Sequence, residues 1–195
     1  MKYKTARQAW HDAYYNGKEN TLIEFLQLGS AIQKTVKSNS LNASVHAWLA
    51  GRVQNAICEL PENIKGFGNF MYSPMRTIDD LEAGQEAVFD HFRYNYNGER
   101  LTDKKLDQSY YLVLAAIYEY FYIVYGNKSP FANAGILCKW LDDNKGVQIN
   151  YHNWGRDWEY IYDRLLDACN YIDMLALEPV SKVIKKYNSS YKEVA

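Results

Sequence analysis

Apolar side chains recur at intervals of three and four residues along nearly the whole chain, and this spacing constrains the fold most strongly. It places these side chains on one face of an α-helix, and no segment keeps the strict alternation of a half-buried strand. We therefore expect an all-α fold, an irregular bundle of seven or eight helices in a single domain at 1–187 with a frayed tail at 188–195. The helices are expected at 4–15, 21–37, 41–60, 78–96, 102–125, 130–141, 153–178 and 180–187.

Several local signals refine this expectation. Thr21 and Glu24 have the spacing of a capping box, and Pro61 and Pro179 are expected to end helices. The segment 102–125 is apolar on two sides, which is typical of a central helix with neighbours on both. The side chains expected at the centre of the core are Trp48, Leu114, Phe121, Trp158 and Leu165.

The composition supports long helices and excludes several classes of protein. Glycine (11) and proline (4) are scarce, whereas 18 Tyr, 7 Phe and 5 Trp supply many large side chains. No apolar stretch follows the basic N-terminus, so no signal or transit peptide is expected, and the most apolar run, 110–125, is too short for a membrane span. Cys58, Cys138 and Cys169 form no CxxC pair and are odd in number, so we expect buried, reduced thiols in a cytoplasmic protein.

The longest predicted loop lies at 61–77, where helical periodicity is lost among two prolines and two glycines. The loop is aromatic, with Phe67, Phe70 and Tyr72 between these residues. A loop of this length is often functional. Its aromatic side chains could pin it to the core or be presented to a partner, and we adopt the second interpretation as the hypothesis to test.

The sequence contains no motif for a metal, a cofactor or nucleophilic catalysis. Its four histidines have no second ligand at helical spacing, and no phosphate-binding loop is present. Glu82, Glu86 and Asp90 recur every four residues, so they share a helix face that could hold a water molecule or a cation, or could simply face solvent. We expect a non-enzymatic protein without a cofactor, and an enzyme with this dispersed acidic site is an alternative.

Charge gives little support for nucleic-acid binding. Residues 1–60 carry a net charge of +3, 61–125 a net charge of −4, and 126–195 none, so no segment has a strong basic excess. A helix-turn-helix reader at 130–175 would present His152, Asn153 and Arg156 to the major groove. The connection at 142–150 is longer than the usual turn of such readers, so this DNA-binding regulator is also an alternative.

Tyrosine and asparagine together supply 34 of the 195 residues. Tyrosine is common in binding surfaces because it offers a large contact area with few rotatable bonds. Both residues also have AT-rich codons, which many phages and mobile elements favour. The tyrosines that fall off the main apolar stripes are Tyr14, Tyr15, Tyr94, Tyr96, Tyr120, Tyr160 and Tyr191.

Together these features indicate a non-enzymatic binding or regulatory protein, with a phage or mobile element as one expected source. It would dock an aromatic surface onto a macromolecular partner, with a protein as the first choice, nucleic acid as the alternative, and no membrane. The expected partner-binding residues are Phe67, Phe70, Tyr72, Tyr94 and Tyr96. The sequence does not indicate an oligomeric state.

Overall fold

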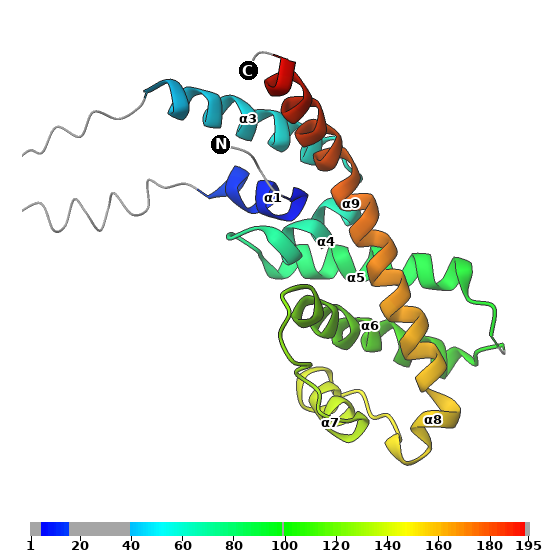
Figure 1. Ribbon diagram of the computed structural model, residues 1–195. Helices are drawn as coiled ribbons and strands as arrows, with labels where there is room; N and C mark the ends of the chain where they lie inside the picture. Colours follow the sequence, from blue (N-terminus) through cyan, green and yellow to red (C-terminus); the bar gives the residue numbers. More distant parts are fainter. Residues whose placement is uncertain (1–4, 16–39, 99, 194–195) are drawn as a thin grey trace, which may run out of the picture. The chain divides into compact units, whose positions relative to one another are not determined.

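The computed structural model describes residues 5–15, 40–98 and 100–193, with backbone alone for 40–44 and 190–193. Within these ranges the protein is all-α and has no strand, which confirms the predicted fold class. The expected capping box and helix at 21–37 lie outside them. In chain order the elements are α1 (Ala6–Tyr14), α3 (Ser40–Cys58), α4 (Glu62–Tyr72), α5 (Ile78–Asn95), α6 (Asp103–Val124), α7 (Ala134–Lys145), the 3₁₀ turn η1 (Tyr151–Asn153), α8 (Trp154–Asp157) and α9 (Glu159–Glu193) (Figure 1).

The described residues fall into two compact units. The first unit contains α1, α3, residues 72–76 and α9 from Leu177 onward. The second contains 61–71 and 77–176, and therefore most of α4, all of α5 to α8 and the first part of α9. The single domain expected from the sequence stays a prediction, because dense contacts within two units do not decide whether they unfold separately.

In the first unit, α1 packs against α3. The Thr5 side chain caps α1 by accepting a hydrogen bond from the Gln8 amide at 3.2 Å. Trp10 is fully buried in α1. The Gln54 side chain of α3 donates to the Ala13 carbonyl at 2.6 Å, which satisfies a backbone acceptor at the end of α1. Local capping and one side-chain bond thus fix α1 on α3.

The segment predicted as a long loop at 61–77 instead contains α4. Pro61 begins this helix, because its carbonyl accepts from the Lys65 amide at 2.9 Å. Gly66 and Gly68 lie inside the helix rather than in a turn. A Cβ on Gly66 would lie 2.6 Å from the Ala83 Cβ, so this glycine permits a close approach of α4 and α5. Only 73–77 remains as a connection between the two helices.

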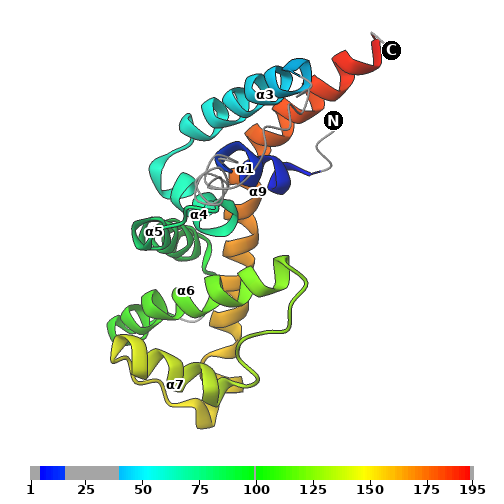
Figure 2. The ribbon, with the colours of Figure 1, turned by 90° about the vertical axis from the view of Figure 1, so that its left-hand side faces the viewer.

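In the second unit, α6 lies between α5 and α7 (Figures 1 and 2). Every residue from Leu112 to Ile117 is buried, which confirms that α6 is a central helix. Thr77 caps α5 in a reciprocal capping box with Asp80. The second carboxylate oxygen of Asp80 accepts from the Asn69 side chain at 3.1 Å, and this bond joins α4 to α5.

Two features near α7 differ from the sequence prediction. The helix begins after Asn133, whose side chain accepts from the Ile136 amide at 3.0 Å, and not at Pro130. Ser129, the residue before Pro130, forms a local turn by accepting a hydrogen bond from the Phe131 amide. The helix also continues through the expected turn at 142–146 until Gly146, whose left-handed backbone ends it.

The last helix is longer than the sequence predicts. Pro179 lies inside α9 and does not separate two helices. A proline costs one backbone hydrogen bond in a helix interior, but buried Ala176, Val180 and Ile184 keep an apolar face through this position. Within the described residues α9 continues to Glu193, and the frayed tail expected at 188–195 stays a prediction.

The predicted core is confirmed at three of its five central positions. Leu114, Trp158 and Leu165 are buried, whereas Phe121 is half-buried. Trp48 is 57% exposed and contacts the Tyr187 ring at 6.3 Å, so its predicted burial is wrong. The buried apolar face of α3 is formed instead by Leu49, Val53 and Ile57.

Candidate functional site

The aromatic residues of the predicted loop are not exposed. Phe67, Phe70 and Tyr72 retain 0%, 7% and 2% of their accessible surface. Phe70 packs edge-on against Tyr118 at 5.7 Å, and Tyr72 lies 6.2 Å from Trp10. The prediction that these side chains point outward is therefore wrong. They became buried because 61–72 folds as a helix, which turns them toward the core.

Tyr94 and Tyr96, the other two predicted partner-binding residues, lie at the end of α5. Tyr94 is 90% exposed. The Tyr96 ring packs between Phe92 at 5.0 Å and Tyr160 of α9 at 5.9 Å. We use the name aromatic surface for the exposed and half-buried rings that α5 and α9 bring to this region, which are those of His91, Tyr94, Tyr96, Tyr160 and Tyr171.

Three rings of the aromatic surface, those of His91, Tyr96 and Tyr171, line a cavity of about 280 Å³. Phe92 and Ala168 are its buried members, and Tyr96 and Tyr171 line its wall. Arg164 also lines it, with its guanidinium 5.4 Å from the Tyr160 ring and in an ion pair with Asp167 at 2.9 Å. The cavity therefore has an apolar interior and a rim of aromatic and charged groups.

Its side chains are held in place by contacts between the two helices. The His91 ring stacks on Tyr171 with a centroid distance of 4.1 Å and an angle of 16°. Partial burial lowers the pKa of His91 below its usual value, so this ring is neutral at pH 7. The Tyr160 hydroxyl donates to the Asn97 side chain at 2.6 Å. Contacts within the protein thus hold these rings in place.

The residues of the DNA-reading alternative lie together on η1 and α8, and all three are exposed. His152 packs on the Tyr151 ring at 4.4 Å. Arg156 donates two hydrogen bonds to Asp157, both at 3.0 Å, which raises the pKa of the guanidinium and lowers that of the carboxyl. Reading a base with Arg156 would require breaking this bidentate pair. Asn153 makes no side-chain capping bond to α8. The DNA-binding alternative stays a prediction.

The acidic row of the enzyme alternative lies on the outer face of α5. Glu82, Glu86 and Asp90 are all exposed. In the part of the chain that the structure describes, no three histidine, cysteine or acidic side chains are grouped as metal ligands. An enzymatic role for this row also stays a prediction.

Two acidic side chains, the buried Asp173 and the half-buried Glu119, pair with tyrosines where α6 and α9 meet. The Tyr120 hydroxyl donates to Asp173 at 2.9 Å and to Asn170 at 3.3 Å, and Asp173 is buried. The Tyr162 hydroxyl donates to Glu119 at 2.5 Å. Tyr120, which falls off the main apolar stripe of its segment, is nevertheless buried, and its hydroxyl has an acceptor inside the core.

The sequence alone identified part of the aromatic surface. It placed Tyr94 and Tyr96 in the site and marked Tyr160 as lying off the apolar stripes. It missed His91 and Tyr171, since their stack joins residues 80 positions apart. Periodicity describes one helix at a time, so it does not indicate which faces of two distant helices meet.

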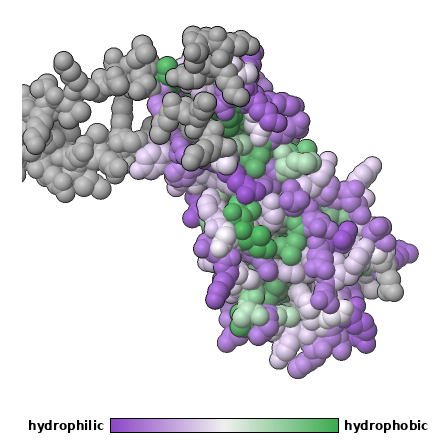
Figure 3. All heavy atoms as spheres, viewed as in Figure 1, coloured by the Kyte–Doolittle hydropathy of each residue, from purple (hydrophilic) through white to green (hydrophobic). Residues whose placement is uncertain are grey.

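Neither the hydropathy of the surface nor the comparisons with known proteins identify a function. On the face shown in Figure 3, hydrophobic residues form small patches among hydrophilic ones. None of the helices in the described ranges combines the length and apolar character of a membrane span. No family model, curated protein or solved structure matches the chain significantly.

Proposed function

We propose that the protein is a non-enzymatic binding protein of regulatory type that docks the aromatic surface onto a segment of a partner protein. The main support for this proposal is the cavity between α5 and α9, whose aromatic side chains are held by contacts such as the stack of His91 on Tyr171. Near it, Tyr94, Tyr160 and Tyr171 remain exposed on the same two helices. The proposal keeps the sequence-based prediction that an aromatic surface binds a partner, but it places that surface on α5 and α9 instead of α4.

The chemistry of the surface supports protein recognition. Tyrosine and arginine are enriched among residues that dominate protein interfaces. The ring contacts of His91 with Tyr171 and of Tyr96 with Tyr160 already restrict these side chains, so binding would lose little rotamer freedom. An exposed tyrosine such as Tyr94 adds contact area without needing to leave the core.

The size of the cavity supports a side chain as its occupant. Sites for small molecules and cofactors usually enclose about 300–1,000 Å³, and this cavity of about 280 Å³ lies below that range. One large apolar side chain, presented by an exposed segment of the partner, would meet Phe92 and Ala168 inside. The surrounding polar backbone of the segment would face Asn95, Arg164 and Asp167 at the rim.

A cytoplasmic site of action is part of the proposal. All three cysteines are free thiols, and Cys138 and Cys169 are buried. Burial raises the pKa of the Cys138 thiol to about 11 and raises that of Cys169 as well, so neither is a reactive thiolate at neutral pH. Such thiols suit a reducing compartment.

A selection from a random peptide library tests the proposal, because it requires only the purified protein and not the partner. Peptides selected on the protein should share one large apolar residue. Their affinity should fall about tenfold or more in Tyr160→Ala and in Tyr171→Ala, since Tyr171 lines the cavity and the Tyr160 ring packs against Tyr96, which also lines it. Fluorescence anisotropy with labelled peptides measures the change.

Tyr111→Ala is the matched control, because Tyr111 is exposed on α6 and does not line the cavity. Its peptide affinity should equal that of the wild type, and all three variants should keep nearly the wild-type melting temperature. Equal affinity of the selected peptides for wild type, Tyr160→Ala and Tyr171→Ala would refute the proposal.

A further inference from the structure

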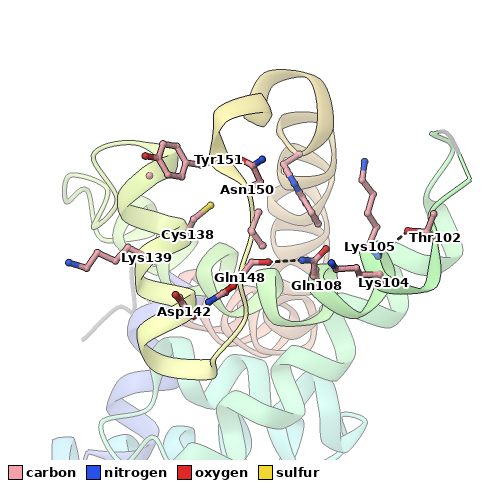
Figure 4. A pocket seen from close by; sticks show the side chains of 13 residues that line it. Thr102, Lys104, Lys105, Gln108, Cys138, Lys139, Asp142, Gln148, Asn150 and Tyr151 are labelled. Atoms are coloured by element: carbon pink, nitrogen blue, oxygen red, sulfur yellow. Dashed lines mark hydrogen bonds between the residues drawn. The ribbon is translucent and has the colours of Figure 1, made fainter.

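A second and larger cleft lies elsewhere in the second unit, among the start of α6, one face of α7 and the segment 148–151 (Figure 4). Its volume is about 730 Å³, which is within the usual range for small-molecule sites. Gln108 of α6 donates to the Gln148 carbonyl at 2.7 Å and holds the segment in place. The cleft is thus built from fixed elements rather than from loose chain.

The charge lining this cleft is mainly positive. Lys104, Lys105 and Lys139 line it together with one acid, Asp142. In the described part of the chain, neither Lys104 nor Lys139 has an ion-pair or hydrogen-bond partner. Figure 4 shows Lys104 beside Gln108, whereas Lys139 extends outward. Lys104 is therefore the cation best placed to meet a ligand inside the cleft.

A second lysine of α6, Lys105, also lines the cleft. The Lys105 ammonium lies 5.6 Å from the Trp158 ring and 3.4 Å from the Asp157 carbonyl, and its distance to the Asp157 carboxylate is 4.0 Å. Because that carboxylate is at the limit of an ion pair, it neutralises Lys105 only in part. The remaining wall offers the side chains of Asn150 and Tyr151 and one acid, Asp142, on α7.

We propose that this cleft binds a small organic anion, a carboxylate or a phosphate monoester, through Lys104 and Lys105. Trp158, whose ring lies 5.6 Å from the Lys105 ammonium and lines the cleft, receives an apolar or planar part of the ligand. Asp142 accepts a hydrogen bond from a ligand hydroxyl or amine and disfavours ligands with several negative charges. This site is independent of the aromatic surface and shares no residue with it.

Titration of the isotope-labelled protein followed by NMR tests the proposal. The probes are phenyl phosphate and benzoate, with phenol as the neutral aromatic and inorganic phosphate as the anion without a ring. At millimolar concentration, phenyl phosphate or benzoate should shift the amides of 102–108 and 148–151 in a saturable way, and phenol should not. Raising the ionic strength should weaken the binding.

Substitutions then test whether Lys104 supplies the positive charge that binds the anion. Lys104→Ala should weaken binding about tenfold, because it removes a charge-assisted hydrogen bond. Lys104→Arg should retain most of the affinity. Lys128→Ala is the control, since Lys128 is exposed and does not line the cleft.

Several outcomes would overturn the proposal. One is the absence of saturable shifts with both organic anions, and another is binding of phenol as tight as that of phenyl phosphate. Unchanged affinity in Lys104→Ala would also contradict it. Tighter binding of inorganic phosphate than of phenyl phosphate would contradict the contact between Trp158 and the ring of the ligand.

Discussion

At the scale of single residues, the buried tyrosines of the core act through their hydroxyl groups as well as their rings. Tyr120 donates to Asp173, which is only 3% exposed. We expect Tyr120→Phe to lower the free energy of unfolding by about 1–3 kcal/mol, because it leaves a buried acceptor without this donor. Denaturant titration measures the loss.

Tyr118→Phe provides the matched control for this substitution. Tyr118 lies on the same helix and packs its ring against Phe70 and Trp140, but within the described residues its hydroxyl has no hydrogen-bond partner. Its stability should stay within about 0.5 kcal/mol of the wild type. Equal losses in the two variants would show that the hydroxyl of Tyr120 contributes nothing.

The buried thiols make stability fall at alkaline pH. In the unfolded chain a thiol has a pKa of about 8.5, whereas burial raises the pKa of Cys138 in the folded protein to about 11. The contribution of Cys138 to the free energy of unfolding is therefore complete below the pKa of the unfolded chain. As the pH rises from that pKa to the folded pKa, this contribution is lost by up to about 1.4 kcal/mol per pH unit, because the thiol of the unfolded chain loses its proton first.

Comparison of two cysteine variants measures this contribution. Unfolding free energies at pH 7 to 10.5 should fall less steeply for Cys138→Ala than for the wild type. Cys58→Ala should keep the wild-type slope, because Cys58 is exposed. Parallel slopes for wild type and Cys138→Ala would contradict the assignment.

At the scale of elements, two glycines allow α4 and α5 to pack closely. A Cβ on Gly84 would lie 3.0 Å from the Phe67 backbone, and one on Gly66 would lie 2.6 Å from Ala83. Gly66→Ala and Gly84→Ala should each destabilise the protein by about 1–3 kcal/mol through overpacking. Thermal melting monitored by circular dichroism measures the change.

Gly51→Ala is the contrasting substitution, because no atom lies within 4 Å of the added Cβ in α3. It should stabilise the protein by about 0.5–1 kcal/mol, since alanine has the higher helix propensity. Destabilisation in Gly51→Ala, or none in Gly66→Ala and Gly84→Ala, would contradict this account of the packing.

The same glycines explain why the sequence prediction failed for α4. Gly66, Gly68 and the flanking Pro61 are typical of a loop when local propensity alone is considered. Their actual role depends on a neighbouring helix that the local pattern does not identify. The starts expected from periodicity at 78 and 102 are confirmed, and Thr77 and Thr102 cap α5 and α6 there.

The errors at Pro179 and in the aromatic surface have the same physical origin. Pro179 stays within α9 because buried residues on both sides hold the helix, and local rules do not include that packing. Tyr96 was identified from its segment, whereas His91 and Tyr171 become a site only when α5 meets α9. Local structure was therefore more predictable than contacts between distant helices.

At the scale of the whole molecule, α9 contributes residues to both compact units. Helix formation is cooperative along a continuous segment, so we expect the two units to unfold in one transition. Tryptophans occur in both units, at Trp10 and Trp48 in the first and at Trp140, Trp154 and Trp158 in the second. Helical circular dichroism and tryptophan fluorescence should give coincident unfolding curves, and two resolved transitions would contradict the single domain.

The central claim is that a partner protein binds the aromatic surface, and photo-crosslinking in the native host tests it most directly. A photoreactive amino acid replaces Tyr94, which is 90% exposed near the end of α5, or Tyr111 as the control position on α6. The account predicts one protein crosslinked from position 94 and not from position 111. That product should be lost when Tyr171→Ala is added. A product of equal yield from both positions, or one that persists in Tyr171→Ala, would contradict the claim.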